Sequence, residues 1–175
     1  MFNQKLSKKV KTKGQAIVEF AIALPVFLAL LIGILEVGRL AFIYSTVNSA
    51  SRNASRYASV VGYEQSGTYL KYVYCDGIKN VAIKSGYMAN LKPSNITISY
   101  DEGPGTTSLG NCTATGGNDT TMKNILDTNN KSIVERVVVK VQVSYQPMLK
   151  LIPIGSRTLT ATSARSILGI IDLEN

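Results

Sequence analysis

The stretch "FAIALPVFLALLIGIL", residues 20–35, is sixteen residues long and contains no charged side chain. As an α-helix it would be roughly 24 Å long, against roughly 30 Å for the hydrocarbon core of a bilayer. The flanking sequences "QAIVE" and "VGRLAFIY" are also largely apolar, so a longer, tilted helix fits the membrane. We therefore predict a transmembrane helix over residues 15–44.

The net charge of +8 is concentrated before this stretch. Five lysines precede Gly14 with no acidic residue among them: Lys5, Lys8, Lys9, Lys11 and Lys13. The rest of the 175-residue chain holds 14 basic and 11 acidic residues, an ordinary balance. Lysines beside an apolar span mark its cytoplasmic side, so we expect residues 45–175 outside the cytoplasm. The charge thus indicates membrane topology and not nucleic-acid binding, with a solvated basic tail as the alternative.

A basic head followed by an apolar run is also typical of a cleaved secretory signal. Such a signal needs small residues in an A-x-A-like pair shortly after the run. The sequence there is "EVGRLAFIY", which contains no such pair. An anchor that stays uncleaved remains open as an alternative.

Glu19 is a carboxylate at the edge of the apolar run, where it needs either a partner or the headgroup layer. Gly14 ends the basic head, and Phe20 follows the glutamate. This order of glycine, four residues, glutamate and aromatic residue resembles the Flp/Tad class of type IV-like prepilins. The resemblance implies cleavage by a prepilin peptidase between Gly14 and Gln15. It also implies that Glu19 pairs with the new amino terminus when subunits align; a position in the headgroup layer is the alternative.

The helix is predicted to continue past the membrane, because residues 37–61 contain no proline and repeat at spacings of three and four. The repeating face comprises Tyr44, Val47, Ala50, Ser51, Ala54, Tyr57, Ala58 and Val61. The opposite side carries Asn48, Arg52, Asn53, Ser55 and Arg56. The alanines, spaced by four, either let a sheet or a second helix approach closely or are simply core. We expect the helix to end near Gly62.

The segment "GQAIVEFAIALPVFLALLIGILEVGRLAFIYSTVNSASRNASRYASV" resembles the signature of TadE-like proteins. After the glycine and glutamate come Pro25 and a Glu36, Gly38, Arg39 stretch. The helix end matches loosely through Ala50, Arg52, Ala54, Arg56, Tyr57 and Ala58, with a serine at position 51 as a departure. The resemblance implies a non-enzymatic minor pilin or pseudopilin in the cytoplasmic membrane. Its partners would be the prepilin peptidase, other pilin or pseudopilin subunits and the Tad assembly platform.

Glu36 and Arg39 are three residues apart and can share a helix face just outside the apolar run. We interpret them as a structural ion pair. A contact with a neighbouring subunit is the alternative.

The rest of the chain predicts a small outer domain. In "VERVVVKVQVSY" the residues Val137, Val139, Val141, Val143 and Tyr145 alternate with more polar ones, as in a half-buried strand. Residues 95–100 and 157–165 alternate similarly, with Pro147, Pro153 and Gly155 as breakers before the last strand. A second helix is expected within residues 70–91, with a stripe of Val73, Ile78, Val81, Ala82, Ser85 and Met88. The predicted fold is α+β and type IV pilin-like: one long helix packed on a three-stranded antiparallel meander.

Cys75 and Cys112 are the two cysteines of the chain. Outside the cytoplasm such a pair indicates a disulfide, with two free thiols as the alternative. Closing a loop of about 37 residues would stabilise the fold by roughly 4 kcal/mol in the chain-entropy model.

Catalytic motifs are weak in this sequence. The absence of histidine removes Ser-His-Asp and Cys-His pairs and most zinc sites. The glycine-rich "GPGTTSLG" lacks the third glycine of a phosphate loop, and "DTNNKS" has a lysine where a calcium loop needs an oxygen ligand. We predict no enzyme activity, metal, cofactor or small-molecule substrate. The remaining alternative function is an uncleaved, anchored binding or adhesion module with residues 102–121 as its recognition surface.

Overall fold

The computed structural model describes residues 13–60, 62–128, 136–148 and 155–167. Most of the lysine-rich head, the strand start before Arg136 and the breaker Pro153 lie outside these residues. By its internal contacts the chain divides into two compact units, Met1–Arg39 and Leu40–Asn175.

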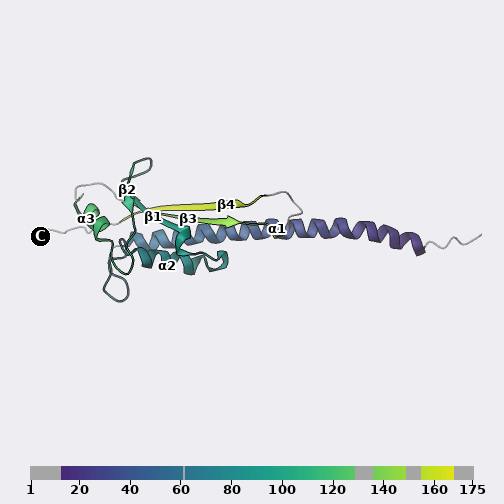
Figure 1. The fold of residues 1–175 in the computed structure, drawn as a ribbon, viewed down its shortest axis with the longest axis horizontal. Helices are drawn as coiled ribbons and strands as arrows, with labels where there is room; N and C mark the ends of the chain where they lie inside the picture. Colours follow the sequence, from purple (N-terminus) through teal and green to yellow (C-terminus); the bar gives the residue numbers. More distant parts are fainter. Residues whose placement is uncertain (1–12, 61, 129–135, 149–154, 168–175) are drawn as a thin grey trace, which may run out of the picture. The chain divides into compact units, whose positions relative to one another are not determined.

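The first unit is built from the N-terminal part of helix α1, which spans Lys13–Ser59 (Figure 1). Among the described residues, α1 is the one helix long and apolar enough to cross a membrane, judged by length and composition. Apolar side chains such as Ile17, Phe20 and Leu30 are exposed in the isolated chain. A continuous apolar surface of this kind belongs in lipid or against other proteins. Pro25 lies inside the helix, where one backbone hydrogen bond is lost, and membrane helices tolerate that loss.

The second unit combines the end of α1 with two shorter helices and one sheet (Figure 1). The helices are α2 (Cys75–Ser85) and α3 (Thr120–Thr128), with 3-10 turns at Tyr87–Ala89 and Pro93–Asn95. The strands are β1 (Ile96–Asp101), β2 (Ser108–Asn111), β3 (Arg136–Tyr145) and β4 (Arg157–Ser166). The sheet has the order β2-β1-β3-β4, and every neighbouring pair is antiparallel. The α+β prediction, a long helix on a small antiparallel sheet, is confirmed.

Strand β3 lies in the middle of the sheet and follows its sequence pattern. It pairs with all ten residues of β4, from Arg136 opposite Ser166 to Tyr145 opposite Arg157. Val137, Val139 and Val141 are fully buried, while the residues between them face the other side. Alternation in the sequence therefore identified both the strand and its buried face.

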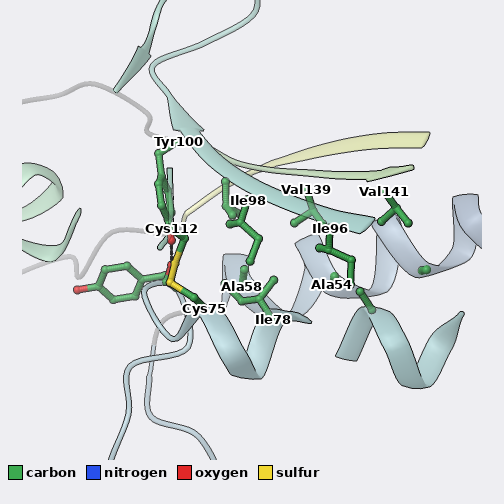
Figure 2. Packing of buried hydrophobic residues seen from close by; sticks show 14 of the residues in the cluster. Ala54, Ala58, Cys75, Ile78, Ile96, Ile98, Tyr100, Cys112, Val139 and Val141 are labelled. Atoms are coloured by element: carbon green, nitrogen blue, oxygen red, sulfur yellow. Dashed lines mark hydrogen bonds between the residues drawn. A yellow bond between two sulfur atoms is a disulfide. The ribbon is translucent and has the colours of Figure 1, made fainter. Parts of the chain in front are cut away.

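The core lies between this sheet and the end of α1, with α2 beside it. One buried cluster contains Ala54 and Ala58 of α1, Ile78 of α2, and Ile98 and Val139 of the sheet, and Figure 2 shows Ala58 beside Ile78. The close approach depends on small residues. A Cβ added at Gly86 would lie 3.1 Å from the Cβ of Ala50 and would collide with Leu91. The alanines of α1 were predicted to let a sheet or a second helix approach closely. In the structure both the sheet and α2 pack in the cluster that contains these alanines.

Four details of the prediction were wrong or incomplete. The sheet has a fourth strand, β2, and the chain has a third described helix, α3. Met88 is 69% exposed and lies after the end of α2, because Gly86 follows the last turn of that helix. Ser55, assigned to the polar side of α1, is fully buried, because β4 covers that side of the helix. Helix α1 ends at Ser59, close to the end that was predicted near Gly62.

Candidate functional site

The segment around the predicted cleavage point forms the first turns of α1. Gly14 and Gln15 are exposed, and apart from the adjoining residues and the local helix backbone no described atom lies within 4 Å of where a Cβ would sit at Gly14. The side-chain amide of Gln15 donates a hydrogen bond to Glu19 Oε1 over 3.0 Å. Phe20 follows with 66% of its surface exposed. The helix thus places Gln15 and Glu19 one turn apart on the same face.

Glu19 stands at one end of an apolar groove on the surface of α1. The groove is lined by Glu19, Ile22, Ala23, Val26, Phe27 and Leu30 and has a volume of about 480 Å³. These positions recur at spacings of three and four, so they share one helix face. The described face therefore consists of one carboxylate followed by about two turns of apolar side chains.

Glu36 and Arg39 interact as their spacing predicts. Arg39 Nη1 lies 3.5 Å from Glu36 Oε1, and both residues are half-buried. Pairs at this helical spacing contribute about 0.3–0.5 kcal/mol, so the pair is a minor stabilising contact.

The predicted disulfide is present. Cys75 and Cys112 are bonded and buried, with their Cα atoms 5.6 Å apart. Cys75 is the first residue of α2, and Cys112 directly follows β2. The bond therefore fastens the short edge strand to the helix that packs beside α1.

Asp119 is a buried carboxylate that the sequence analysis missed. Its Oδ2 accepts hydrogen bonds from the backbone N–H groups of Thr113 and Ala114, and its Oδ1 accepts one from Met122. Because Asp119 directly precedes α3, the last of these bonds caps that helix. Burial alone would raise the pKa of Asp119, but the backbone hydrogen bonds outweigh burial and lower it. The available signal was the aspartate before "TTMKN", an ordinary helix start.

Cys75, Cys112 and Asp119 bring their potential ligand atoms within 4.8 Å of one another. They are nevertheless poor metal ligands, because both sulfurs are consumed by the disulfide. The carboxylate is likewise engaged by backbone N–H groups. The group therefore holds the fold together and offers no open coordination site.

The segment 102–121, the alternative recognition surface, is fastened to the rest of the unit. Gly116 N donates to Asp76 Oδ2 over 2.6 Å, and Leu70 N donates to Asn118 Oδ1 over 2.9 Å. With the disulfide and Asp119, these bonds give a polar, glycine-rich stretch a defined path. They also explain how β2 forms without an apolar pattern.

Comparison with known proteins finds one family similarity, in the first part of the chain. The model of the family described as "TadE-like protein" matches residues 14–56. The comparison with curated proteins and the comparison with solved structures each give no match. The matched region holds Gly14, Glu19, the apolar groove and the Glu36–Arg39 pair, all on α1. Over residues 14–56 the chain is similar to the TadE-like family.

Proposed function

We propose that this chain is a minor pilin or pseudopilin that takes part in assembling a Flp/Tad-type pilus or a related secretion apparatus. A prepilin peptidase cuts it after Gly14, and the mature protein begins at Gln15. The observation that carries the proposal is the register of Gly14, Gln15 and Glu19 at the head of an exposed apolar helix within a TadE-like match.

The proposed cleavage point lies close to the start of α1. The described part of α1 begins at Lys13, so the proposed cut after Gly14 lies two residues into it. Terminal helical turns open at the lowest free-energy cost, so the peptide bond can be presented to a protease there. The open space around Gly14 leaves room for the enzyme to approach the backbone.

The cut changes the electrostatics of Glu19. It creates an ammonium group on Gln15, one turn from a carboxylate that is already hydrogen-bonded to the Gln15 side chain. A charge pair in or near lipid is far less costly than an isolated carboxylate. The new amine therefore neutralises Glu19 on its own helix or on a neighbouring one, and the apolar groove beside Glu19 packs against that neighbour. The charge pair and the apolar contact together favour association of neighbouring helices in one register.

The remaining assignments follow from the same proposal. The protein is anchored in the cytoplasmic membrane, with its N-terminus in the cytoplasm and its sheet domain outside. The disulfide supports an oxidising location for that domain. Its partners are the prepilin peptidase, other pilin or pseudopilin subunits and the Tad assembly platform, and its role is structural.

Mass spectrometry of the protein extracted from membranes of peptidase-containing cells tests the proposal. We expect an N-terminal peptide that starts at Gln15. Gly14→Leu should block the cut, because the bulky side chain replaces the open space before the scissile bond. Gly33→Ala, at another open position of α1, is the matched control and should be cut normally. A functional protein that keeps Met1 would favour the uncleaved binding module instead.

A further inference from the structure

A polar groove lies between the end of α1 and strand β4. Arg52, Asn53 and Arg56 line it from the helix, and Ser163 and Arg165 line it from the strand. Its volume is about 430 Å³. All of these residues belong to the unit that begins at Leu40.

Hydrogen bonds of small side chains hold the floor of the groove in place. Ser55, fully buried beneath it, shares a 2.8 Å hydrogen bond with the hydroxyl of Ser163, so α1 and β4 are joined there by two small side chains. The Ser55 hydroxyl also donates to the carbonyl of Arg52. Because these contacts use no long side chain, the arginines above them remain directed to solvent, and each is exposed.

The charge of the groove is not compensated within the described part of the chain. Arg52, Arg56 and Arg165 contribute three positive charges, and no acidic residue lines the groove. Four described acidic side chains of this unit are engaged elsewhere. Asp101 pairs with Arg136, Asp119 caps α3, Asp76 accepts from Gly116, and Glu64 accepts from Ser66. An anion that enters the groove therefore meets three guanidinium groups without a competing carboxylate.

Strand β4 adds a second feature beside the groove. It is ten residues long and pairs with β3 on one edge, while no strand of the described residues pairs with its other edge. A long unpaired edge presents a row of backbone N–H and C=O groups to any extended chain. Every second residue of an added strand would point to the side of the sheet that carries α1 and the groove.

We infer that the groove and the free edge of β4 form a docking site for an extended acidic segment of another protein. That segment pairs with β4 as an additional strand and places alternate carboxylates against Arg52, Arg56 and Arg165. The inference goes beyond the proposed function and does not depend on cleavage after Gly14.

Two other occupants fit the geometry less well. Arg52 is eight residues beyond Tyr44, about 12 Å along the helix, and the headgroup layer is only about 5–8 Å thick, so lipid phosphates lie short of the groove. A second copy of the chain would bring one β4 against another. Arg157 and Arg165 stand at opposite ends of that strand, so an antiparallel pair would oppose like charges.

Fluorescence anisotropy with the full chain in neutral detergent micelles tests the inference. The probe is a labelled ten-residue peptide that alternates threonine with glutamate, and its control has glutamine at every glutamate position. We expect the glutamate peptide to bind at least about tenfold more tightly. Its affinity should fall when salt is raised from about 0.05 to about 0.5 M. N-methylation of the backbone amides on one edge of the peptide should abolish binding, because strand pairing needs those N–H groups.

Single substitutions test whether the peptide binds at the groove. Arg56→Gln and Arg165→Gln should each weaken binding about tenfold. Lys84→Gln, which removes an exposed positive charge from α2, should leave binding unchanged. All three side chains are exposed, and unchanged circular-dichroism melting curves would exclude unfolding as the cause.

Several results would overturn the inference. They are equal binding of the glutamate and glutamine peptides, no effect of the two arginine variants, or no effect of N-methylation. Binding of anionic phospholipid vesicles or inorganic phosphate through the same arginines, without peptide binding, would assign the groove to phosphate. Binding that arises only in a chain ending at Ile167 would assign it to the acidic residues Asp172 and Glu174 of this chain. The N-terminus of each variant is measured in parallel, so failure of the docking site and failure of cleavage are separated.

Discussion

Glu19 and Asp119 are two carboxylates with opposite surroundings. Asp119 is buried and accepts backbone N–H groups, whereas Glu19 is exposed on an apolar helix with one amide contact. A buried carboxylate with several hydrogen bonds stabilises the fold to which it belongs. A lone carboxylate among apolar side chains has a high free-energy cost in lipid. Its role therefore depends on the group that neutralises its charge. The two residues therefore lead to different kinds of prediction.

Replacing Asp119 with alanine should destabilise the outer domain by about 2–4 kcal/mol. The change removes the cap of α3 and leaves the N–H groups of Thr113 and Ala114 without their acceptor. Urea unfolding of the full chain in detergent, followed by near-ultraviolet circular dichroism, measures the loss. Asp119→Asn keeps one acceptor oxygen and should be less destabilising.

Asp119 also predicts the effect of acid. Because its folded pKa is lowered, its contribution is fully present above the unfolded value of about 3.9 and is lost as pH falls through the lowered pKa. The difference in unfolding free energy between the native chain and Asp119→Asn should therefore shrink below about pH 4. A constant difference down to pH 2 would contradict this account.

Replacing Glu19 with glutamine should reduce pilus assembly by about tenfold or more while leaving cleavage after Gly14 intact. Glutamine can still accept a hydrogen bond from Gln15, but it offers no negative charge to the new amine. Counting surface pili and sequencing the mature N-terminus measure the two effects separately. Glu36→Gln is the matched control, because it removes a carboxylate from the same helix at the Arg39 pair. Normal piliation in the Glu19 variant would refute the alignment role.

At the scale of elements, the disulfide connects two pieces of structure that hold each other in place. Strand β2 is four residues long and is paired through β1 alone, so it has little stability of its own. Cys112 follows it directly and is bonded to the start of α2, which packs in the core. A covalent link thus adds to the few apolar contacts of this short strand, in which Leu109 packs against the core.

The double change of Cys75 and Cys112 to serine should lower the unfolding free energy by about 3–4 kcal/mol. The physical reason is that the unfolded chain regains the freedom of a closed loop of 37 residues. The urea midpoint of the full chain in detergent measures this loss, and chemical reduction of the native chain should give the same value. An unchanged midpoint would show that hydrogen bonds such as that of Asp119 hold the segment without the disulfide.

At the scale of the whole molecule, the chain combines a unit with an exposed apolar surface and a unit with its own core. Only the second resembles a soluble domain in its burial. The first is unsuited to water, because its exposed side chains are mostly large and apolar. This contrast favours a protein anchored through its N-terminal helix, with the sheet domain in an aqueous compartment.

The orientation of that domain can be measured with a single new thiol. Thr68 is exposed in a loop of the second unit, and the native cysteines are bonded to each other. We expect Thr68→Cys to react with a membrane-impermeant maleimide in cells whose cytoplasmic membrane is intact. Lysed cells provide the full-labelling control. Labelling that requires lysis would place the domain in the cytoplasm and reverse the predicted topology.

The sequence alone predicted the long helix, the strands β1, β3 and β4, the cysteine pair and most of the buried face of α1, except that Tyr44 is exposed and Ser55 is buried. These features depend on local periodicity, on the length of an apolar run and on covalent chemistry, and all three can be read from neighbouring residues. Gly14, Gln15 and Glu19 also came from a local pattern, and their roles in cleavage and alignment stay predictions.

Only the tertiary structure decided the course of residues 102–119, the role of Asp119, the burial of Ser55 and the basic groove beside β4. Helix α3 does carry an apolar stripe of Met122, Ile125 and Leu126 at helical spacing, which the sequence analysis missed. Strand β2 has no strong apolar pattern, since hydrogen bonds and a disulfide to distant residues hold this part of the chain. Ser55 is buried because Ser163, far away in the sequence, supplies its partner. Long-range pairing of polar groups leaves no periodic trace in the sequence, so these features were visible only once the chain had folded.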